Sequence, residues 1–273
     1  MLFANKKVLI TGGSRGIGKA IAIRLAAAGA DIAIVGKTAE PHPKLEGTIY
    51  TAADEIRQAG GRKVVPIQGD IRFEESIRHI VKTTTEELGG IDILINNASA
   101  ISLTATEQTE PKRWDLMHDI NVRGTFLMSR ACIPYLKQGD NAHILNLSPP
   151  LNLNPEWFGR YLAYTISKYG MSMIVLGLAH ELREHRIGVN ALWPRTTIAT
   201  AAIQNVVGGD ALMQRSRKPE IVADAAFHIL QRPSAECTGN FFIDEDELKK
   251  EGVTDFEKYA VNPSGKLMQD LFL

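Results

Sequence analysis

Cysteine and excess charge are both scarce in this sequence. Its only cysteines are Cys132 and Cys237, which lack a paired spacing, so we expect neither a disulfide scaffold nor a cysteine-based zinc site, and no other metal. The 31 basic residues balance the 31 acidic residues. Because nucleic acids and anionic membranes select proteins with a basic excess, we expect neither of them as a partner.

Long hydrophobic runs are absent as well. The longest nearly apolar run, residues 171–179, is too short to span a bilayer. The first residues, MLFANKKVLITGG, lack the charged-then-apolar layout of a signal peptide. The last four, DLFL, are not a peroxisomal tripeptide of the SKL type. We therefore expect a cytoplasmic protein in a reducing compartment.

The sequence does contain a regular alternation of short apolar runs with longer helical stretches. Strands are expected at residues 7–11, 31–35, 63–68, 91–96, 143–147, 189–193 and 240–243. Helices are expected at residues 16–28, 51–59, 73–88, 111–136, 160–184 and 219–230. Nearly every strand is apolar on both faces, as in a parallel sheet covered on both sides. The pattern predicts an α/β fold with a single doubly wound parallel sheet of the Rossmann type, of about seven strands.

The first predicted strand runs into a glycine-rich turn, T-G-G-S-R-G-I-G, at residues 11–18. Glycines let the backbone approach a pyrophosphate, and the next helix presents its positive end to the anion. A P-loop is the alternative, since residues 13–19 match G-x-x-x-x-G-K, but Ala20 stands where a Ser or Thr must hold magnesium. The turn therefore predicts dinucleotide binding, with contacts from Gly12, Gly13, Ser14, Arg15, Gly16, Ile17 and Gly18.

No repeat or low-complexity segment divides the 273 residues, so we expect one domain. Residues 1–244 are expected to form the dinucleotide-binding and catalytic domain. Residues 245–273 are expected to be a short helical extension packed on it. Residues 37–49 are expected to form a long proline-bearing loop after the second strand.

The T-G-x-x-x-G-x-G spacing resembles the fingerprint of the short-chain dehydrogenases/reductases. Further motifs of that family follow in order: Asp70 in QGDI, N-N-A at 96–98 with Ser99 for the usual last glycine, Asn121 in INVRGTF, Y-x-x-x-K at 164–168, and NALWP at 190–194. The resemblance covers nearly the whole chain, and stretches such as LSPPLNLNPEWF resemble one branch in particular. It implies a homodimer or homotetramer, and cofactor contacts from Asp70, Ile71, Asn97, Ala98, Tyr164, Lys168, Pro194 and Thr197.

Side chains four residues apart share a helix face, with Cβ atoms about 6 Å apart, so Lys168 can lie beside Tyr164. By spacing alone the two could be unrelated surface groups. An ammonium favours the phenolate, so we expect Lys168 to lower the pKa of Tyr164 from about 10 and make it an acid/base. The family uses the pair in this way, and its lysine also holds the nicotinamide ribose. The resemblance also implies that Asn121 bends its helix and holds a water in a proton relay.

The second predicted strand ends in Val35-Gly36-Lys37-Thr38, without the carboxylate that commonly holds the ribose hydroxyls of NAD. Arg15 and Lys37 can approach a 2′-phosphate from two sides, so we expect NADP as the cofactor. The alternative is that both are solvated surface cations.

The family ends its fifth strand with paired hydroxyls, as in N-I-S-S, and the second serine hydrogen-bonds the substrate oxygen. Here the sequence reads N-L-S-P at residues 146–149, so Pro149 occupies that position without a donor. Three alternatives stay open: Ser148 has taken the role, Asn152 or Asn154 supplies the donor, or Tyr164 works without one. We favour Ser148 as the catalytic hydroxyl.

These motifs predict an oxidoreductase that transfers a hydride between NADP(H) and a carbonyl or secondary alcohol. The partly apolar loop at residues 195–217 is expected to line a pocket for a hydrophobic or lipid-like substrate. A catalytically silent nucleotide-binding regulator or scaffold on the same fold is an alternative. A sugar-nucleotide epimerase of the related extended family is another, against which the glycine spacing and the short C-terminal part speak.

Overall fold

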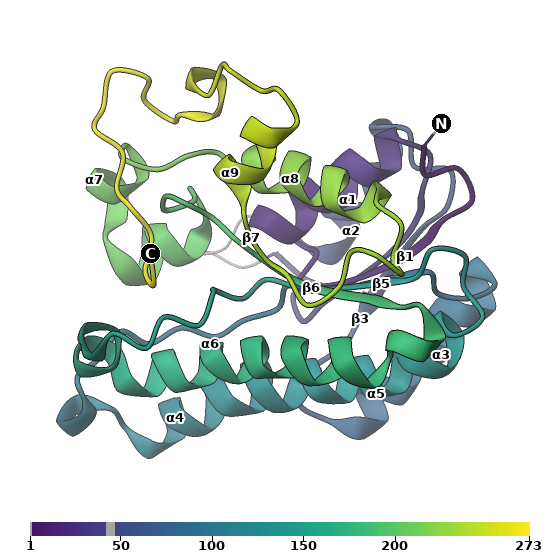
Figure 1. The fold of residues 1–273 in the computed structure, drawn as a ribbon, viewed down its shortest axis with the longest axis horizontal. Coiled ribbons are helices and arrows are strands. Elements are labelled where there is room, and N and C mark those ends of the chain that lie inside the picture. Colours follow the sequence, from purple (N-terminus) through teal and green to yellow (C-terminus); the bar gives the residue numbers. More distant parts are fainter. Residues whose placement is uncertain (1, 42–46) are drawn as a thin grey trace.

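The computed structural model describes residues 2–41 and 47–273. Seven parallel strands form one sheet in the order β3-β2-β1-β4-β5-β6-β7 (Figure 1). The strands are β1 Lys7–Thr11, β2 Asp31–Gly36, β3 Val64–Gln68, β4 Ile93–Asn96, β5 His143–Asn146, β6 Gly188–Trp193 and β7 Phe241–Ile243. The predicted doubly wound Rossmann-type sheet is therefore confirmed.

Helices cover both faces of the sheet, as Figure 1 shows. One face carries α1 Gly16–Ala27, α2 Ile49–Gln58 and α8 Glu220–Gln231, and the other carries α3 Glu74–Leu88, α5 Thr125–Leu136 and α6 Pro155–Glu181. Two shorter helices, α7 Gly209–Met213 and α9 Asp244–Lys250, lie toward the C-terminal part of the chain. Because the strands are apolar on both faces, each helical layer buries its own core against them.

The strand order reverses between β1 and β4, since the chain builds outward from β1 in both directions. Such a switch point leaves a crevice at the carboxyl ends of the strands, where open α/β sheets bind their ligands. Thr11 at the end of β1 lies in register with Asn96 at the end of β4. The glycine-rich turn and the N-N-A motif therefore meet at this crevice.

Two predicted helices have different bounds from those expected. The segment predicted as one helix at 111–136 is α4 Pro111–Met117, a π-helical stretch His118–Gly124 and then α5. The helix predicted from residue 160 begins at Pro155, where the Asn154 side chain accepts a hydrogen bond from Glu156 N at 3.0 Å. A kink at Tyr161 (φ −145°, ψ 57°) separates this first turn and a half from the rest of α6. Proline is well placed in the first turn of a helix, which explains the earlier start.

By length and composition alone, α6 could cross a membrane, but 61% of its most apolar stretch is buried inside the protein. It packs against the π-helical stretch and β6 and so belongs to the core. Of the loop predicted at 37–49, residues 42–46 lie outside the described residues, and α2 begins at Ile49 behind the capping side chain of Thr48.

The chain after β7 returns to the carboxyl ends of the strands. Helix α9 packs on α8, and the yellow segment beyond it in Figure 1 runs back past α7 toward the start of α6. Residues 268–270 are held by backbone hydrogen bonds from Thr197 N to Met268 O (3.0 Å) and from Asp270 N to Arg195 O (3.1 Å). The division of the chain at residue 244 stays a prediction.

Candidate active site

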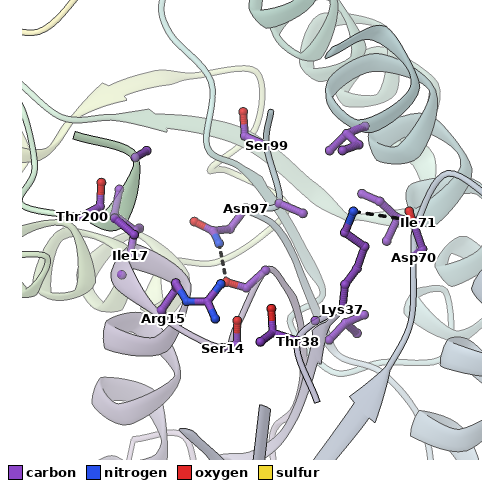
Figure 2. A pocket seen from close by; sticks show the side chains of 18 of the residues that line it. Ser14, Arg15, Ile17, Lys37, Thr38, Asp70, Ile71, Asn97, Ser99 and Thr200 are labelled. Atoms are coloured by element: carbon purple, nitrogen blue, oxygen red, sulfur yellow. Dashed lines mark hydrogen bonds and ion pairs between the residues drawn. The ribbon is translucent and has the colours of Figure 1, made fainter. Parts of the chain in front are cut away.

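The glycine-rich turn after β1 is tied to the end of β4 by side-chain hydrogen bonds. Thr11 Oγ1 accepts from the backbone N–H groups of Asn97 and Ala98, both at 3.1 Å. The Asn97 side chain donates to the carbonyls of Thr11 and Gly12, both at 3.0 Å; Figure 2 shows Asn97 beside the turn. The threonine and the N-N-A motif therefore hold the turn open toward the crevice.

The glycines of this turn are required by close approach. Gly12 has a φ of +67°, and a Cβ there would lie 2.9 Å from Asn97 Nδ2. A Cβ on Gly18 would lie 2.5 Å from the Gly12 carbonyl oxygen, so α1 could not pack so closely behind the turn. Helix α1 begins at Gly16 and directs its positive end into the same space.

A cavity of about 450 Å³ opens in front of this turn (Figure 2). Most of the residues expected to bind the cofactor line it: Gly12, Ser14, Arg15, Gly16, Ile17, Lys37, Asp70, Ile71, Asn97 and Ala98. Gly13 and Gly18 do not, because they pack inward, Gly13 against Ile34 and Gly18 against Gly12 and Asn97. These residues fit a dinucleotide, with glycines and a helix N-terminus for the pyrophosphate.

Two cations, Arg15 and Lys37, and one carboxylate, Asp70, line this cavity. Lys37 Nζ lies 3.7 Å from Asp70 Oδ2, and Arg72 binds the same carboxylate at 2.6 Å. Burial alone would raise the pKa of Asp70, but the hydrogen bonds from Arg72 and the charge of Lys37 outweigh it and lower the pKa. Arg15 Nη2 donates to the Gly47 carbonyl at 3.0 Å. Among the described lining residues Asp70 is the sole acid, so the end of β2 offers no carboxylate to a ribose.

A second cavity, of about 330 Å³, adjoins the first and shares Ile17, Asn97, Ser99, Thr200 and Ala202 with it. It contains Tyr164, Lys168, Pro194 and Thr197, the remaining residues expected to contact the cofactor. Its other walls are mostly apolar: Ile101, Leu103, Leu147, Trp193, Ile198, Ile203, Val207, Leu212, Met268 and Leu271. The expected site residues thus fall into two adjoining cavities.

Tyr164 and Lys168 are both buried, with 6% and 2% of their surface exposed. Lys168 Nζ donates to the Leu147 carbonyl at 2.6 Å and lies 5.0 Å from the centre of the Trp193 ring. The expected lowering of the tyrosine pKa is wrong for this state of the protein: burial raises the pKa of Tyr164 above its usual value, and the charge of Asp270 raises it further. Burial also lowers the pKa of Lys168 to about 7, so the lysine carries its charge only in part at neutral pH.

Asn121 lies in the π-helical stretch, which agrees with the expected distortion of its helix. Its side chain accepts from Ala100 N (2.8 Å) and donates to Ala100 O (2.9 Å) and Ser167 Oγ (3.0 Å). It therefore links the segment after β4 to the residue preceding Lys168. Both of its side-chain N–H groups are used in this link, and its role in a water relay stays a prediction.

Ser148 is fully buried, and its hydroxyl has no hydrogen-bond partner among the described residues. It does not line the second cavity, although its neighbour Leu147 does. The Asn152 side chain donates to Phe272 O at 3.4 Å and accepts from Asn154 N at 3.0 Å, while Asn154 caps α6. The two asparagines thus have structural partners, and Ser148 as the catalytic hydroxyl stays a prediction.

Residues 6–208 match the family model of the short-chain dehydrogenases, and the chain belongs to this family of oxidoreductases, which use a nicotinamide cofactor. It is 58% identical over 266 residues to hydroxysteroid dehydrogenase-like protein 2 of Bos taurus, and 57% identical over the same length to that of Homo sapiens. These matches cover 97% of this chain and 63% of each relative, so the chain spans less than two thirds of their length.

Among solved structures, a short-chain dehydrogenase from Mycobacterium thermoresistibile is 54% identical, with a TM-score of 0.93. That match covers 100% of this chain and 96% of the other.

Several lining residues were missed by sequence reasoning. Ser99 and Thr200 line both cavities. Ser99 belongs to the N-N-A-S motif, so its place in that motif could have predicted it. Thr200 lies in the loop after β6, which was expected to line a pocket. Asp270 lines the second cavity from a segment that carries no motif, and nothing in the local sequence signals its place.

Proposed function

We propose that this protein transfers a hydride between NADP(H) and a carbonyl or secondary alcohol, with Tyr164 as the acid/base. The observation that carries this proposal is the joining of the two cavities. The Tyr164–Lys168 pair lines one, the phosphate-binding turn lines the other, and Asn97 and Ser99 lie in both. A dinucleotide along the first cavity would bring its reactive end to the second and would supply or accept the hydride.

Tyr164 donates a proton to the carbonyl oxygen during reduction and takes one from the alcohol during oxidation. Burial raises the pKa of Tyr164 in this state of the protein, so the phenol is neutral at pH 7 and carries the proton that reduction requires. Lys168 favours the phenolate once it is charged, and its hydrogen bond to Leu147 O holds it at the wall of the cavity. The apolar walls exclude water and support a hydrophobic or lipid-like substrate.

The test of this function is a spectrophotometric screen of NADPH oxidation against ketones, aldehydes and acyl thioesters. Tyr164→Phe is expected to lower kcat by about 10²- to 10⁴-fold, because it removes the proton donor alone. The dissociation constant for NADPH, measured by fluorescence, should stay nearly unchanged. Retention of more than about half of the activity by Tyr164→Phe would show that the acid/base is another group.

A preference for NADP(H) is the finer part of the proposal. Lys37 and Arg15 line the first cavity and the end of β2 supplies no acid, which supports contacts to a 2′-phosphate. The double variant Arg15→Ala/Lys37→Ala is expected to weaken NADPH binding by roughly 10- to 100-fold while NADH binding changes little. Lys82→Ala, which removes an exposed lysine on α3, is the control. Equal affinities of the unmodified protein for NADPH and NADH would count against the preference.

A catalytically silent nucleotide-binding protein is the second candidate. The observation that favours it is the absence of a hydroxyl in the position that Pro149 occupies. The same screen separates the two candidates: tight NADPH binding without turnover on any carbonyl would favour the silent protein.

A further inference from the structure

The residues that line the second cavity range from buried to exposed. Tyr164 and Lys168 are almost fully buried and mark its inner part. Of the lining residues that the first cavity does not share, three are exposed: Arg160, Met268 and Gln269. The Arg160 side chain is 58% exposed and Met268 is 42% exposed. These three residues therefore mark the place where the cavity opens to water, which we call the mouth.

The mouth is rich in hydrogen-bond donors. Arg160 contributes a guanidinium, and its neighbour Tyr161, which also lines the cavity, contributes a hydroxyl. Gln269 contributes a side-chain amide from the segment that Thr197 N holds by a hydrogen bond to Met268 O at 3.0 Å. The side chains of Tyr161 and Gln269 have no hydrogen-bond partner among the described residues.

Arg160 has one partner, the Glu156 carboxylate one helical turn earlier in the chain. Both side chains are about half exposed, and an exposed pair at this spacing contributes little to stability. The guanidinium can therefore exchange this partner for a ligand at small cost. A carboxylate suits it because the planar guanidinium can donate two parallel hydrogen bonds to the two oxygens.

The inner part of the cavity is a poorer place for an anion. Lys168 Nζ already donates to the Leu147 carbonyl at 2.6 Å, and the carboxyl group of Asp270 lines the same cavity. Around them the walls are mostly apolar, so an anion there would lose its water without full compensation. At the mouth, by contrast, an anion keeps part of its water and meets Arg160.

We propose that the second cavity binds an amphipathic oxo acid or hydroxy acid, with its carboxylate at Arg160, its apolar chain along the walls and its carbonyl or alcohol at Tyr164. This inference names the substrate class of the proposed function, and it rests on that function for the position of the carbonyl. In reduction, NADPH gives its hydride to the keto carbon and Tyr164 gives its proton to the oxygen. The products are the hydroxy acid and NADP⁺, solvent returns a proton to Tyr164, and the carboxylate is unchanged.

The first test measures binding without turnover. Decanoate and decanol are titrated by calorimetry into the protein saturated with NADP⁺, and the preference for the acid is the dissociation constant of decanol divided by that of decanoate. Arg160→Gln is expected to lower this preference by about 10-fold, because a hydrogen bond to a charged group is lost. Glu156→Gln should raise it by about two-fold, because it frees the guanidinium.

Two further variants locate the binding site. Arg183→Gln replaces an exposed arginine beyond the other end of α6 and should leave the preference unchanged. Leu103→Trp fills the cavity from its wall and should weaken both ligands by about 10-fold or more. Thermal unfolding of each variant checks that the fold is retained.

The second test measures turnover with a matched pair of substrates: the decanoate that carries a keto group beside its terminal methyl group, and the methyl ester of that acid. Arg160→Gln is expected to lower the ratio of kcat/KM for the acid to that for the ester by about 10-fold. The loss should appear in KM more than in kcat, because Arg160 binds the carboxylate equally in the substrate and in the transition state.

The outcomes separate this inference from the proposed function. An unchanged preference in Arg160→Gln, an equal change in Arg183→Gln, or decanoate binding that Leu103→Trp does not weaken would overturn the inference, while the acid/base role of Tyr164 would stand. If Arg160→Gln lowers the preference in binding but no oxo compound is reduced, the cavity does take the amphipathic acid and the proposed function fails.

Discussion

Ser148 is the residue at which this chain departs most clearly from the family pattern. Its hydroxyl is buried beside the strand end, one residue after the Leu147 carbonyl that holds Lys168. Since Pro149 offers no donor, Ser148 is the hydroxyl at the end of β5 that a change of the backbone would bring toward a substrate oxygen. A buried hydroxyl without a partner is unusual in a folded protein, and a catalytic role is one of the explanations for it.

Ser148→Ala is expected to lower kcat by about 10²-fold, as expected when a donor to a developing oxyanion is lost. Its thermal midpoint should change little, because no hydrogen bond of the folded protein is removed. Asn152→Ala should lower kcat less, since that side chain bonds to Phe272 O and Asn154 N. Steady-state kinetics and thermal unfolding of both variants make the comparison, and a near-full rate in Ser148→Ala would remove this serine from the catalytic residues.

At the scale of elements, the sheet could be predicted because each strand is an apolar run bounded by glycine or polar residues. All seven strands fall within one or two residues of their expected bounds. Helix ends were harder to predict, although Asn154-Pro155 is itself a cap followed by a first-turn proline. The family resemblance implied the distortion at Asn121, but the periodicity of the segment did not, since Asn121 is held by residues 21 and 46 positions away.

In the site, too, features held by neighbouring residues could be predicted, and features held by distant segments could not. The phosphate-binding turn is a contiguous motif whose glycines meet Asn97 for steric reasons, so its place at the crevice followed from the sequence. The pKa of Tyr164 did not, because burial and the charge of Asp270 depend on segments brought together by the fold. Spacing on one helix predicts which side chains are neighbours, and it does not predict how strongly the surroundings desolvate them.

Strand β5 carries a buried histidine with a consequence for stability. His143 is 1% exposed, its Nε2 lies 3.1 Å from the Arg232 carbonyl, and burial lowers its pKa to about 4. An unfolded histidine has a pKa of about 6.5, so the unfolded state takes up the proton first. The free energy of unfolding should therefore fall as the pH drops from about 6.5 to about 4, by roughly 3 kcal/mol at most.

Urea unfolding at several pH values between 7.5 and 4.5 measures this loss. His143→Gln is expected to be less stable at pH 7.5, where it disturbs a buried contact, but to show a flatter dependence on pH. His185→Gln, which replaces an exposed histidine, should keep the pH dependence of the original protein. Parallel curves for the protein and His143→Gln would mean that other groups cause the acid sensitivity.

At the scale of the whole molecule, the outer surface of one helical layer carries exposed apolar side chains. On the layer of α5 and α6, four large apolar side chains are exposed: Phe126 (49%), Ile166 (38%), Met173 (60%) and Leu176 (46%). Positions 166, 173 and 176 follow helical spacing along one face of α6, and α5 packs beside it. The cytoplasmic location expected from the sequence stays a prediction, as does the oligomeric state.

We expect this apolar face to bury itself against a second copy of the chain, giving a homodimer or a homotetramer. Analytical ultracentrifugation should then show a species larger than one chain at micromolar concentration. Met173→Glu/Leu176→Glu places two charges on the face and should shift the species toward the monomer, with the thermal midpoint of the monomer largely kept because both side chains are exposed. Tyr50→Glu, which puts a charge on an exposed aromatic residue of α2, should leave the assembly unchanged. A monomeric protein, or a double variant that assembles as before, would show that the face of α5 and α6 has no such role.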